Sequence, residues 1–251
     1  MARTPSSMKR SRVGVIGLGV MGRPMAANLL SKGATGVDIT GRNKTRYGDL
    51  LDSGAHWHDS PRSLASSVDA ILLMLPDLPE IEAVLGGPDG VLAGGFDHLL
   101  LIISSTSSPT GVRELAQRLR ASSDGAVAVV DAPVSGGSEG AVAGTLSIMV
   151  GGADEDVAQA IPILSACGSP VHLGPLGSGQ VAKACNQMIV AATILALGEA
   201  AVLAHRSGLD LDQLFTLLAG GYAGSRLLDT RRVRLVTEDY SPSGIARYMV
   251  K

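Results

Sequence analysis

Short apolar runs alternate with amphipathic segments from residue 12 to about residue 173. Runs such as Val13–Ile16, Leu99–Ile103 and Val127–Asp131 lack the period-two alternation of a half-exposed strand, so they predict strands that are buried on both faces. The amphipathic segments 61–67 and 109–120 lie between such runs, and in each a proline preceded by a serine begins the expected helix. This alternation predicts an α/β fold with a mostly parallel, doubly wound sheet. The other strands are expected at 37–40, 70–75, 146–150 and 171–173, and the other helices at 22–31, 79–85 and 155–167.

After the last of these strands the pattern changes. A proline-free stretch at about 179–206 is rich in Ala, Leu, Ile and Val and predicts one long helix that is apolar nearly all round. Such a helix has to be buried by a second domain or by a partner subunit. Two shorter helices are expected at 209–218 and 225–236. We therefore expect an α/β domain over residues 12–176 and an all-helical domain over residues 177–251.

Composition argues against several classes of protein. Hydrophobic residues make up 45% of the chain and charged residues 18%, which allows a core to form and argues against disorder. A formal net charge of −2 with 3% aromatic residues makes nucleic-acid binding a poor hypothesis. No uninterrupted apolar run approaches the ~18 residues of a membrane span, so none is expected. The two cysteines, Cys167 and Cys185, predict a reduced, cytoplasmic protein.

The sequence Gly17-Leu18-Gly19-Val20-Met21-Gly22 follows the first expected strand and opens the first expected helix. At this place a G-x-G-x-x-G is typical of a dinucleotide-binding loop. Its first glycine permits the tight turn, its second lets the backbone approach a pyrophosphate, and its third lets the helix pack on the strand. The helix N-terminus favours the anion. We expect a Rossmann-type, dinucleotide-binding domain, with an ordinary glycine-rich turn as the alternative.

The end of the second strand indicates which dinucleotide binds. Asp38 lies inside that expected strand, whereas Arg42, Asn43 and Lys44 follow it directly. NAD sites usually carry an acidic residue at the strand end for the ribose diol, and a basic residue there suits the 2′-phosphate of NADP. Arg42 can hold that phosphate through two N–H groups. The sequence predicts NADP, with NAD as the alternative, and a solvated loop charge is the other interpretation of Arg42.

Three further segments follow apolar strands, at 75–77, 105–109 and 131–137. In an open parallel sheet, ligands bind outside the carboxyl ends of the strands, so these loops are expected to face one crevice. The successive backbone amides of 135–137, with a serine hydroxyl, suit a carboxylate. A glycine-rich turn is the plain alternative for this last segment.

Lys183 lies one turn inside the long apolar helix. Asn186 and Gln187 follow on the same face, one turn further on. Because lysine is rarely fully buried without a partner, a polar face at a domain junction indicates a site, with a lysine that reaches solvent at the rim as the alternative. His56 and His58 can share a strand face, but no third ligand stands near them, so no metal is expected.

Together these segments resemble the β-hydroxyacid dehydrogenase family, which includes 3-hydroxyisobutyrate dehydrogenases and tartronate semialdehyde (2-hydroxy-3-oxopropionate) reductases. The likeness runs from Arg12 to Lys251 and rests on the ordered motifs 17–29, 131–137 and 179–187. The resemblance implies a Rossmann-type N-terminal domain, an all-helical C-terminal domain, and homodimers or homotetramers that pack through the helical domain. It also implies that the C-terminal domain is shortened relative to the family.

The resemblance implies reversible hydride transfer between a nicotinamide coenzyme and a small hydroxy acid or semialdehyde, with Lys183 as general acid and base. The substrate, a small carboxylate, is expected at Ser135, Gly136 and Asn186 from the resemblance, and at Gly137 and Gln187 from the residues themselves. The coenzyme is expected at the 17–22 loop, Arg42, Asn43, Lys44, Leu75, Pro76, Thr106 and Lys251.

A free lysine, with a pKa near ~10.4, is too basic to act as a base at neutral pH, so burial has to lower the pKa of Lys183. Two other functions stay open. An imine reductase shares the fold and the glycine loop but commonly carries another residue in place of this lysine. A non-catalytic coenzyme-binding module is the other alternative, and the retained Lys183 argues against both.

Overall fold

The computed structural model describes residues 12–32, 36–239 and 241 of the chain. Two compact units, Met1–Lys183 and Ala184–Lys251, meet inside the longest helix. The division expected between residues 176 and 177 lies just before that helix begins. Lys251, one of the expected coenzyme contacts, lies outside the described residues.

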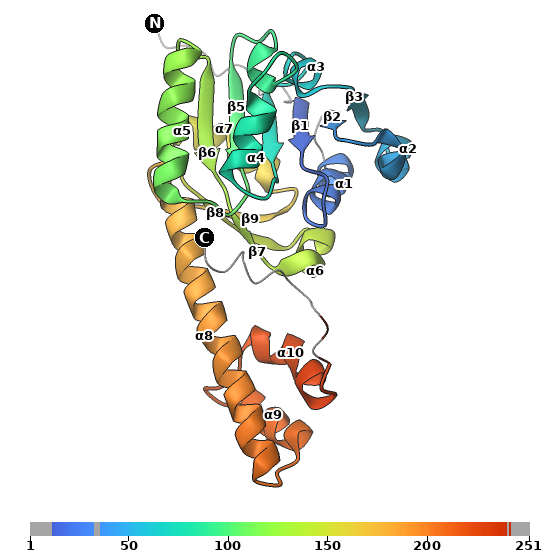
Figure 1. Cartoon of the computed structure of the whole chain (residues 1–251), viewed down its shortest axis with the longest axis vertical. Helices are drawn as coiled ribbons and strands as arrows, with labels where there is room; N and C mark the ends of the chain where they lie inside the picture. The colour runs from blue at the N-terminus through green and yellow to red at the C-terminus, as the bar shows by residue number, and fades with distance from the viewer. Residues whose placement is uncertain (1–11, 33–35, 240, 242–251) are drawn as a thin grey trace, which may run out of the picture. The chain divides into compact units, whose positions relative to one another are not determined.

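A six-stranded sheet forms the centre of the first unit (Figure 1). Its strand order is β3-β2-β1-β4-β5-β6, and every pairing in it is parallel. The order reverses between β1 and β4, which is where an open α/β sheet binds its ligand. The strands are β1 Arg12–Ile16, β2 Gly36–Thr40, β3 His56–His58, β4 Ala70–Leu73, β5 Leu99–Ile103 and β6 Val127–Asp131.

The apolar strands are buried on both faces, as their sequences predict. Within β4, Ala70 and Leu72 join one hydrophobic cluster while Ile71 and Leu73 join the other. Helices α1 and α7 supply side chains to the first cluster, and α3, α4 and α5 supply side chains to the second. The bounds are α1 Gly22–Lys32, α2 Gly48–Asp52, α3 Pro61–Ala65, α4 Leu78–Leu85, α5 Pro109–Ser122 and α7 Asp154–Leu164, with 3-10 turns η1 Lys44–Tyr47 and η2 Val91–Ala93.

The chain beyond β6 differs from the expectation of a single sheet. β7 (Val134–Ser135), β8 (Leu146–Val150) and β9 (Gly168–His172) form a separate three-stranded sheet in which β7 and β8 are antiparallel. A short helix, α6 (Gly137–Ala143), begins at the last residue of the segment 131–137 and is not among the helices expected from the sequence. Asp131 pairs with Gly151 in an isolated antiparallel bridge, in the same register as the antiparallel pairs of β7 with β8. The chain thus passes from β6 to β7 without turning back, and β8, which follows α6, runs in the opposite direction.

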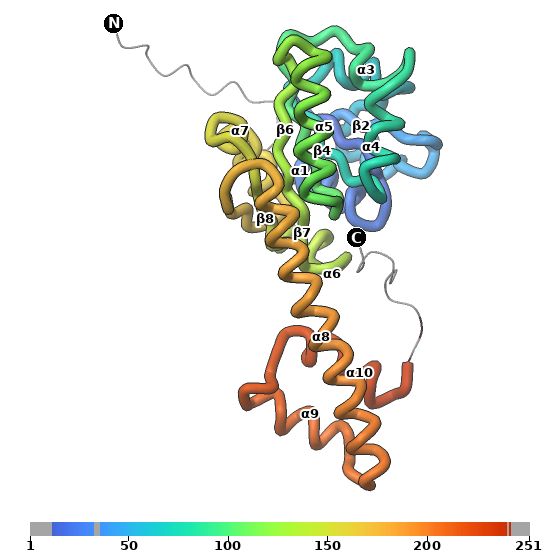
Figure 2. The backbone as a smooth tube through the Cα atoms, turned by 60° about the vertical axis from the view of Figure 1, so that its left-hand side comes forward, coloured from blue at the N-terminus to red at the C-terminus, as the bar shows by residue number. Residues whose placement is uncertain are grey.

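Helix α8 runs from Ser178 to Arg206, close to the expected range. In the second unit, α9 (Leu211–Ala219) and α10 (Arg226–Val236) pack beside the C-terminal half of α8 around a small core that contains Phe215 (Figure 2). Only 17% of the most apolar window of α8 is buried, and its mean hydropathy of 1.9 is high enough for a membrane span. No membrane span was expected from the uninterrupted apolar runs, but α8 has the length and the hydropathy of one, and within the described residues the chain buries only a small part of its apolar window.

Candidate active site

The loops expected to form a site leave from one edge of the main sheet. Because all six strands are parallel, their carboxyl ends lie along the same edge. The glycine loop follows β1, segment 41–44 follows β2, Leu75 and Pro76 follow β4, and Thr106 follows β5, while Asp131 is the last residue of β6. The topology thus gathers these residues at one edge, and their contacts with a ligand stay predictions.

The glycine loop leaves an open cradle at its middle glycine. Gly17 has a φ of +100°, and a Cβ there would come within 2.2 Å of the Met74 carbonyl oxygen. A Cβ on Gly22 would come within 2.0 Å of the Gly17 carbonyl oxygen, so packing within the protein explains both glycines. Gly19 has ordinary backbone angles and open space around its Cβ position. The protein itself gives no reason for glycine there, whereas the close approach of a pyrophosphate does.

The other residues of this loop divide between core and surface. The Leu18 side chain is 8% exposed and belongs to the hydrophobic core, and Met21 packs against that core. Val20 is 76% exposed. At this loop the Leu18 and Met21 side chains are therefore taken up by the core, whereas the Val20 side chain is accessible from outside.

The segment after β2 is exposed and basic. Arg42, Asn43 and Lys44 all lie at the surface. The Asn43 side-chain oxygen accepts hydrogen bonds from the Thr45 N–H (3.1 Å) and the Thr45 hydroxyl (2.7 Å), so it caps η1. Behind the loop, the rings of Tyr47 and Trp57 stack with their centroids 6.2 Å apart. The two basic side chains are thus presented on a capped turn.

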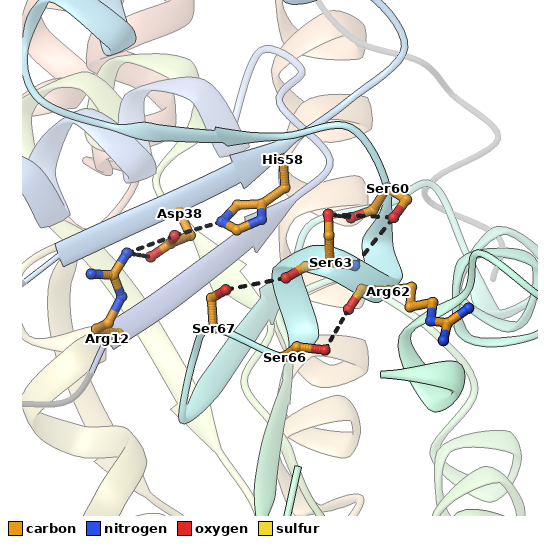
Figure 3. A network of polar contacts seen from close by, with 8 residues as sticks. All are labelled: Arg12, Asp38, His58, Ser60, Arg62, Ser63, Ser66 and Ser67. Carbon is orange, nitrogen blue, oxygen red and sulfur yellow. Dashed lines mark hydrogen bonds and ion pairs between the residues drawn. The ribbon is translucent and has the colours of Figure 1, made fainter. Parts of the chain in front are cut away.

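Asp38 is buried inside β2, and its carboxylate contacts two side chains (Figure 3). Nη2 of Arg12 donates to both carboxylate oxygens at 2.8 Å, and Nε2 of His58 lies 2.7 Å from Oδ1. This carboxylate is therefore not presented at the end of the strand for a ribose diol. Among the described residues, no group of three or more His, Cys, Asp or Glu side chains is placed to hold a metal ion.

The loops after β4 and β5 are tied to each other and to the first turn of α8. The Ser105 hydroxyl accepts the Leu75 N–H at 3.0 Å. Gln180, only 1% exposed, donates from Nε2 to the Ser105 carbonyl (2.8 Å) and accepts the Ser107 N–H at Oε1 (2.9 Å). Thr106 lies between these two anchored residues. One glutamine thus fixes both sides of an expected coenzyme contact.

Asp131, the last residue of β6, accepts hydrogen bonds from the backbone at the start of α8, including the N–H of Gln180. Its carboxylate is fully buried, and it accepts the Gly177 N–H at Oδ1 and the Gln180 N–H at Oδ2, both at 2.7 Å. Burial raises the pKa of Asp131, while these two amide bonds oppose the rise. Sequence reasoning included Asp131 and Gln180 in its motifs but gave neither a role. The signal was an acidic residue that ends an apolar strand and a glutamine in the first turn of a long helix.

Lys183 follows Gln180 by one helical turn and is 8% exposed. Its burial lowers the pKa of the ammonium group, because a charged amine is poorly solvated inside the protein. In the second unit, the Asn186 amide donates to the Gln187 side-chain oxygen at 3.0 Å, and both residues are half-buried. In the first unit, Ser135 is half-buried and Gly136 and Gly137 are exposed, with φ values of +132° and +65°.

Comparison with known proteins places this chain in a family. Residues 12–184 match the family described as the NAD binding domain of 6-phosphogluconate dehydrogenase. Residues 177–251 match the family described as NAD-binding of NADP-dependent 3-hydroxyisobutyrate dehydrogenase. The chain belongs to the β-hydroxyacid dehydrogenase family. The resemblance read from the three motifs is thereby confirmed.

Individual relatives within the β-hydroxyacid dehydrogenase family agree with this assignment. The 3-hydroxyisobutyrate dehydrogenase of Pseudomonas aeruginosa is 38% identical over 213 residues, covering 83% of this chain and 70% of the relative. The 2-hydroxy-3-oxopropionate reductase of Escherichia coli is 35% identical over 232 residues, covering 92% and 78%. The solved structure of a Mycobacterium tuberculosis 3-hydroxyisobutyrate dehydrogenase with L-serine matches with a TM-score of 0.80 at 31% identity, covering 96% and 83%.

The chain is therefore an NAD(P)-dependent oxidoreductase of the hydroxyacid dehydrogenase type. Imine reductases are also among the proteins of known structure that share its fold. Their identity to this chain is 24% or lower, so that likeness concerns the fold alone. The family assignment favours the hydroxyacid reading over the imine reductase alternative.

Proposed function

We propose that this chain transfers a hydride between NADP(H) and a small β-hydroxy acid or its semialdehyde, with Lys183 as general acid and base. The observation that carries the proposal is a buried lysine with a lowered pKa, one turn after the residue that anchors α8 to the strand-end loops. A nicotinamide coenzyme supplies the ring that takes or gives the hydride when it is bound. The relatives named above support the substrate class.

In the proposed mechanism the Lys183 amine moves the substrate proton. In oxidation the neutral amine takes the proton of the substrate hydroxyl, and in reduction the ammonium group gives a proton to the carbonyl oxygen. The lowered pKa supports this role, because a general base works best when its pKa lies nearer the working pH. The Ser135 hydroxyl and the backbone amides of 136–137 would hold the substrate carboxylate. Asn186 and Gln187 would orient the substrate.

The proposed reaction can be tested with a panel of small hydroxy acids and semialdehydes, assayed with both coenzymes. In Lys183→Ala we expect kcat on the best substrate to fall about 10²–10⁴-fold, the usual contribution of a general acid–base group. The dissociation constant of the coenzyme should stay unchanged. Lys32→Ala, at an exposed lysine of α1, is the matched control. A kcat in Lys183→Ala within about tenfold of the wild type would remove Lys183 from this role.

We propose NADP as the preferred coenzyme. Two observations support it: the Asp38 carboxylate is occupied inside the sheet, and Arg42 and Lys44 are exposed at the end of β2. In Arg42→Ala we expect the affinity for NADP⁺ to fall about tenfold or more, because charge-assisted hydrogen bonds are worth about 1.5–3 kcal/mol. The affinity for NAD⁺ should change little. Arg62→Ala, at an exposed arginine of α3, is the control, and an unchanged NADP⁺ affinity in Arg42→Ala would refute the assignment.

We further propose that α8 pairs with a second copy of the chain, in a cytoplasmic homodimer or homotetramer. Large apolar side chains recur on α8 every seven residues, which is the spacing of helices that pack along one another. They are Val181, Met188, Leu195 and Val202, between 49% and 73% exposed. Light scattering without detergent should give a dimer or tetramer, and Leu195→Glu should lower that mass. Recovery of the wild type in the membrane fraction would contradict the proposal.

A further inference from the structure

We propose that Gln180 is a positioning residue, which sets the place of Lys183 relative to the loop that carries Thr106. Asp131 fixes the same helical turn from the end of β6. The inference rests on the proposed function for the role of Lys183, and it adds two residues to the machinery around that role.

The Gln180 amide joins the helix to the loop through both of its polar atoms. Its Nε2 donates to the Ser105 carbonyl at 2.8 Å and its Oε1 accepts the Ser107 N–H at 2.9 Å. A side chain that both donates and accepts can satisfy this pair of groups in only one orientation. The loop and the first turn of α8 are therefore held in one register.

The position of Lys183 follows from the position of Gln180. Residues three apart on a helix lie on the same side. Gln180 and Lys183 are 1% and 8% exposed, whereas the Val181 between them is 49% exposed. A rotation or shift of this turn that broke the glutamine bonds would move the amine of Lys183 by a comparable amount. A displacement of ~1 Å at a reacting group can reduce a rate about 10²-fold.

The second anchor limits movement of the same turn toward or away from the sheet. Each carboxylate oxygen of Asp131 accepts one backbone N–H, from Gly177 and from Gln180. A Cβ on Gly179 would lie 2.2 Å from the Met149 carbonyl oxygen, so the turn packs directly against strand β8. The two amides are occupied by Asp131, and they are therefore not offered to the carboxylate of a substrate.

A packing role alone would not require a glutamine at position 180. A buried amide costs free energy unless its hydrogen bonds are made, and a leucine of similar volume fills the same space without that requirement. The glutamine bonds reach the backbone on either side of Thr106, which is an expected coenzyme contact. The bonding pattern thus links the loop expected to meet the coenzyme with the turn that leads to the proton-transfer group.

The test follows the Lys183 amine directly, with lysine labelled with ¹³C at Cε. The chain has five lysines, and the NMR signal missing in Lys183→Met identifies Lys183. In Gln180→Leu we expect this signal to shift and to titrate at higher pH, because water reaches the released amine. The other lysine signals should stay in place. Gln159→Leu, at an exposed glutamine of α7, is the matched control and should change none of them.

Steady-state kinetics provide the second readout. In Gln180→Leu we expect kcat to fall about tenfold to a hundredfold, while the dissociation constant of the coenzyme changes much less. Gln180→Glu keeps the acceptor for the Ser107 N–H but loses the donor to the Ser105 carbonyl. It should fall between the wild type and Gln180→Leu in kcat, and its NMR titration is not compared because the new carboxylate raises the pKa of Lys183 by its charge alone. Gln180→Met, which is uncharged, carries the NMR test if Gln180→Leu fails to fold.

The outcomes separate this inference from the proposed function. If the Lys183 signal keeps its position and its titration in folded, uncharged Gln180 variants, the positioning role is refuted whatever the activity. If the wild type turns over no hydroxy acid, the proposed function fails, but the NMR comparison still decides whether Gln180 positions Lys183. A shifted Lys183 signal together with the kcat loss supports both.

Discussion

Asp38 and Asp131 are two fully buried carboxylates on strands of the same sheet, and their hydrogen-bond partners are of different kinds. Asp38 lies in the middle of β2 and binds side chains, Arg12 and His58, that are 44% and 16% exposed. Asp131 lies at the end of β6 and binds two backbone amides at the start of α8. The partners of Asp38 are near water, whereas those of Asp131 lie in the protein interior. The comparison indicates that the first carboxylate joins neighbouring strands and the second fixes a helix at the site.

Removing the Asp131 carboxylate should have the larger effect on stability. In Asp131→Ala the N–H groups of Gly177 and Gln180 lose their acceptors, and a buried unsatisfied donor costs about 1–3 kcal/mol. Relief of the burial cost of the carboxylate offsets part of this. We expect the free energy of unfolding at pH 7 to fall by about 2–4 kcal/mol, as measured by urea denaturation.

The same substitution should reduce the proposed activity, since it loosens the turn before Lys183. Asp154→Ala is the matched control, because the Asp154 carboxylate is fully exposed at the start of α7 and should matter little to either measurement. Equal losses of stability in Asp131→Ala and Asp154→Ala would show that the buried amides do not depend on Asp131.

The pH dependence of the two reaction directions should sharpen the difference between the two carboxylates. Reduction needs the Lys183 ammonium group, so its rate should fall about tenfold per pH unit above the pKa of Lys183, and oxidation should show the opposite trend. Burial places that inflection below the ordinary lysine value of 10.5. In Asp131→Asn, which loosens the turn, the inflection should move to higher pH, whereas in Asp38→Asn it should stay. An inflection that moves equally in both variants would contradict the comparison.

The parts of this molecule that could be read from the sequence are those that depend on local pattern. The runs that became β4 and β5 predicted buried parallel strands, because apolar residues occupy both faces. The glycine loop was readable because its glycines are needed within a single strand–turn–helix unit. Asp38 was placed inside β2 by its position among apolar neighbours, and the structure buries it there.

The parts that sequence reasoning missed depend on partners far apart in the chain. Strand β3 has three residues and no apolar run, so it is not among the expected strands, although His56 and His58 were considered for one strand face. The bond of His58 to an aspartate 20 residues away was not expected. The antiparallel pairing of β7 with β8 depends on the chain turning back between them, where α6 lies, and the two-residue β7 is too short to give a periodic signal. The bond from Gln180 to the Ser105 carbonyl spans 75 residues, so only the folded chain reveals it.

Removing the Asp38 carboxylate should have the smallest effect, although the group is as deeply buried as Asp131. In Asp38→Ala the guanidinium group of Arg12 is already 44% exposed and can turn to water, and the His58 side chain, at 16% exposed, is also within reach of water. Removing one partner of an ion pair lowers stability most when the other partner is left as a buried, uncompensated charge. The Arg12 guanidinium group is not left in that position, because it is partly exposed. We expect the free energy of unfolding to fall by about 1–2 kcal/mol in urea denaturation, with kcat on the best substrate unchanged. A loss as large as that of Asp131→Ala would mean that the exposure of the partners does not set the cost, and the contrast between the two carboxylates would have to be explained by their positions in the sheet.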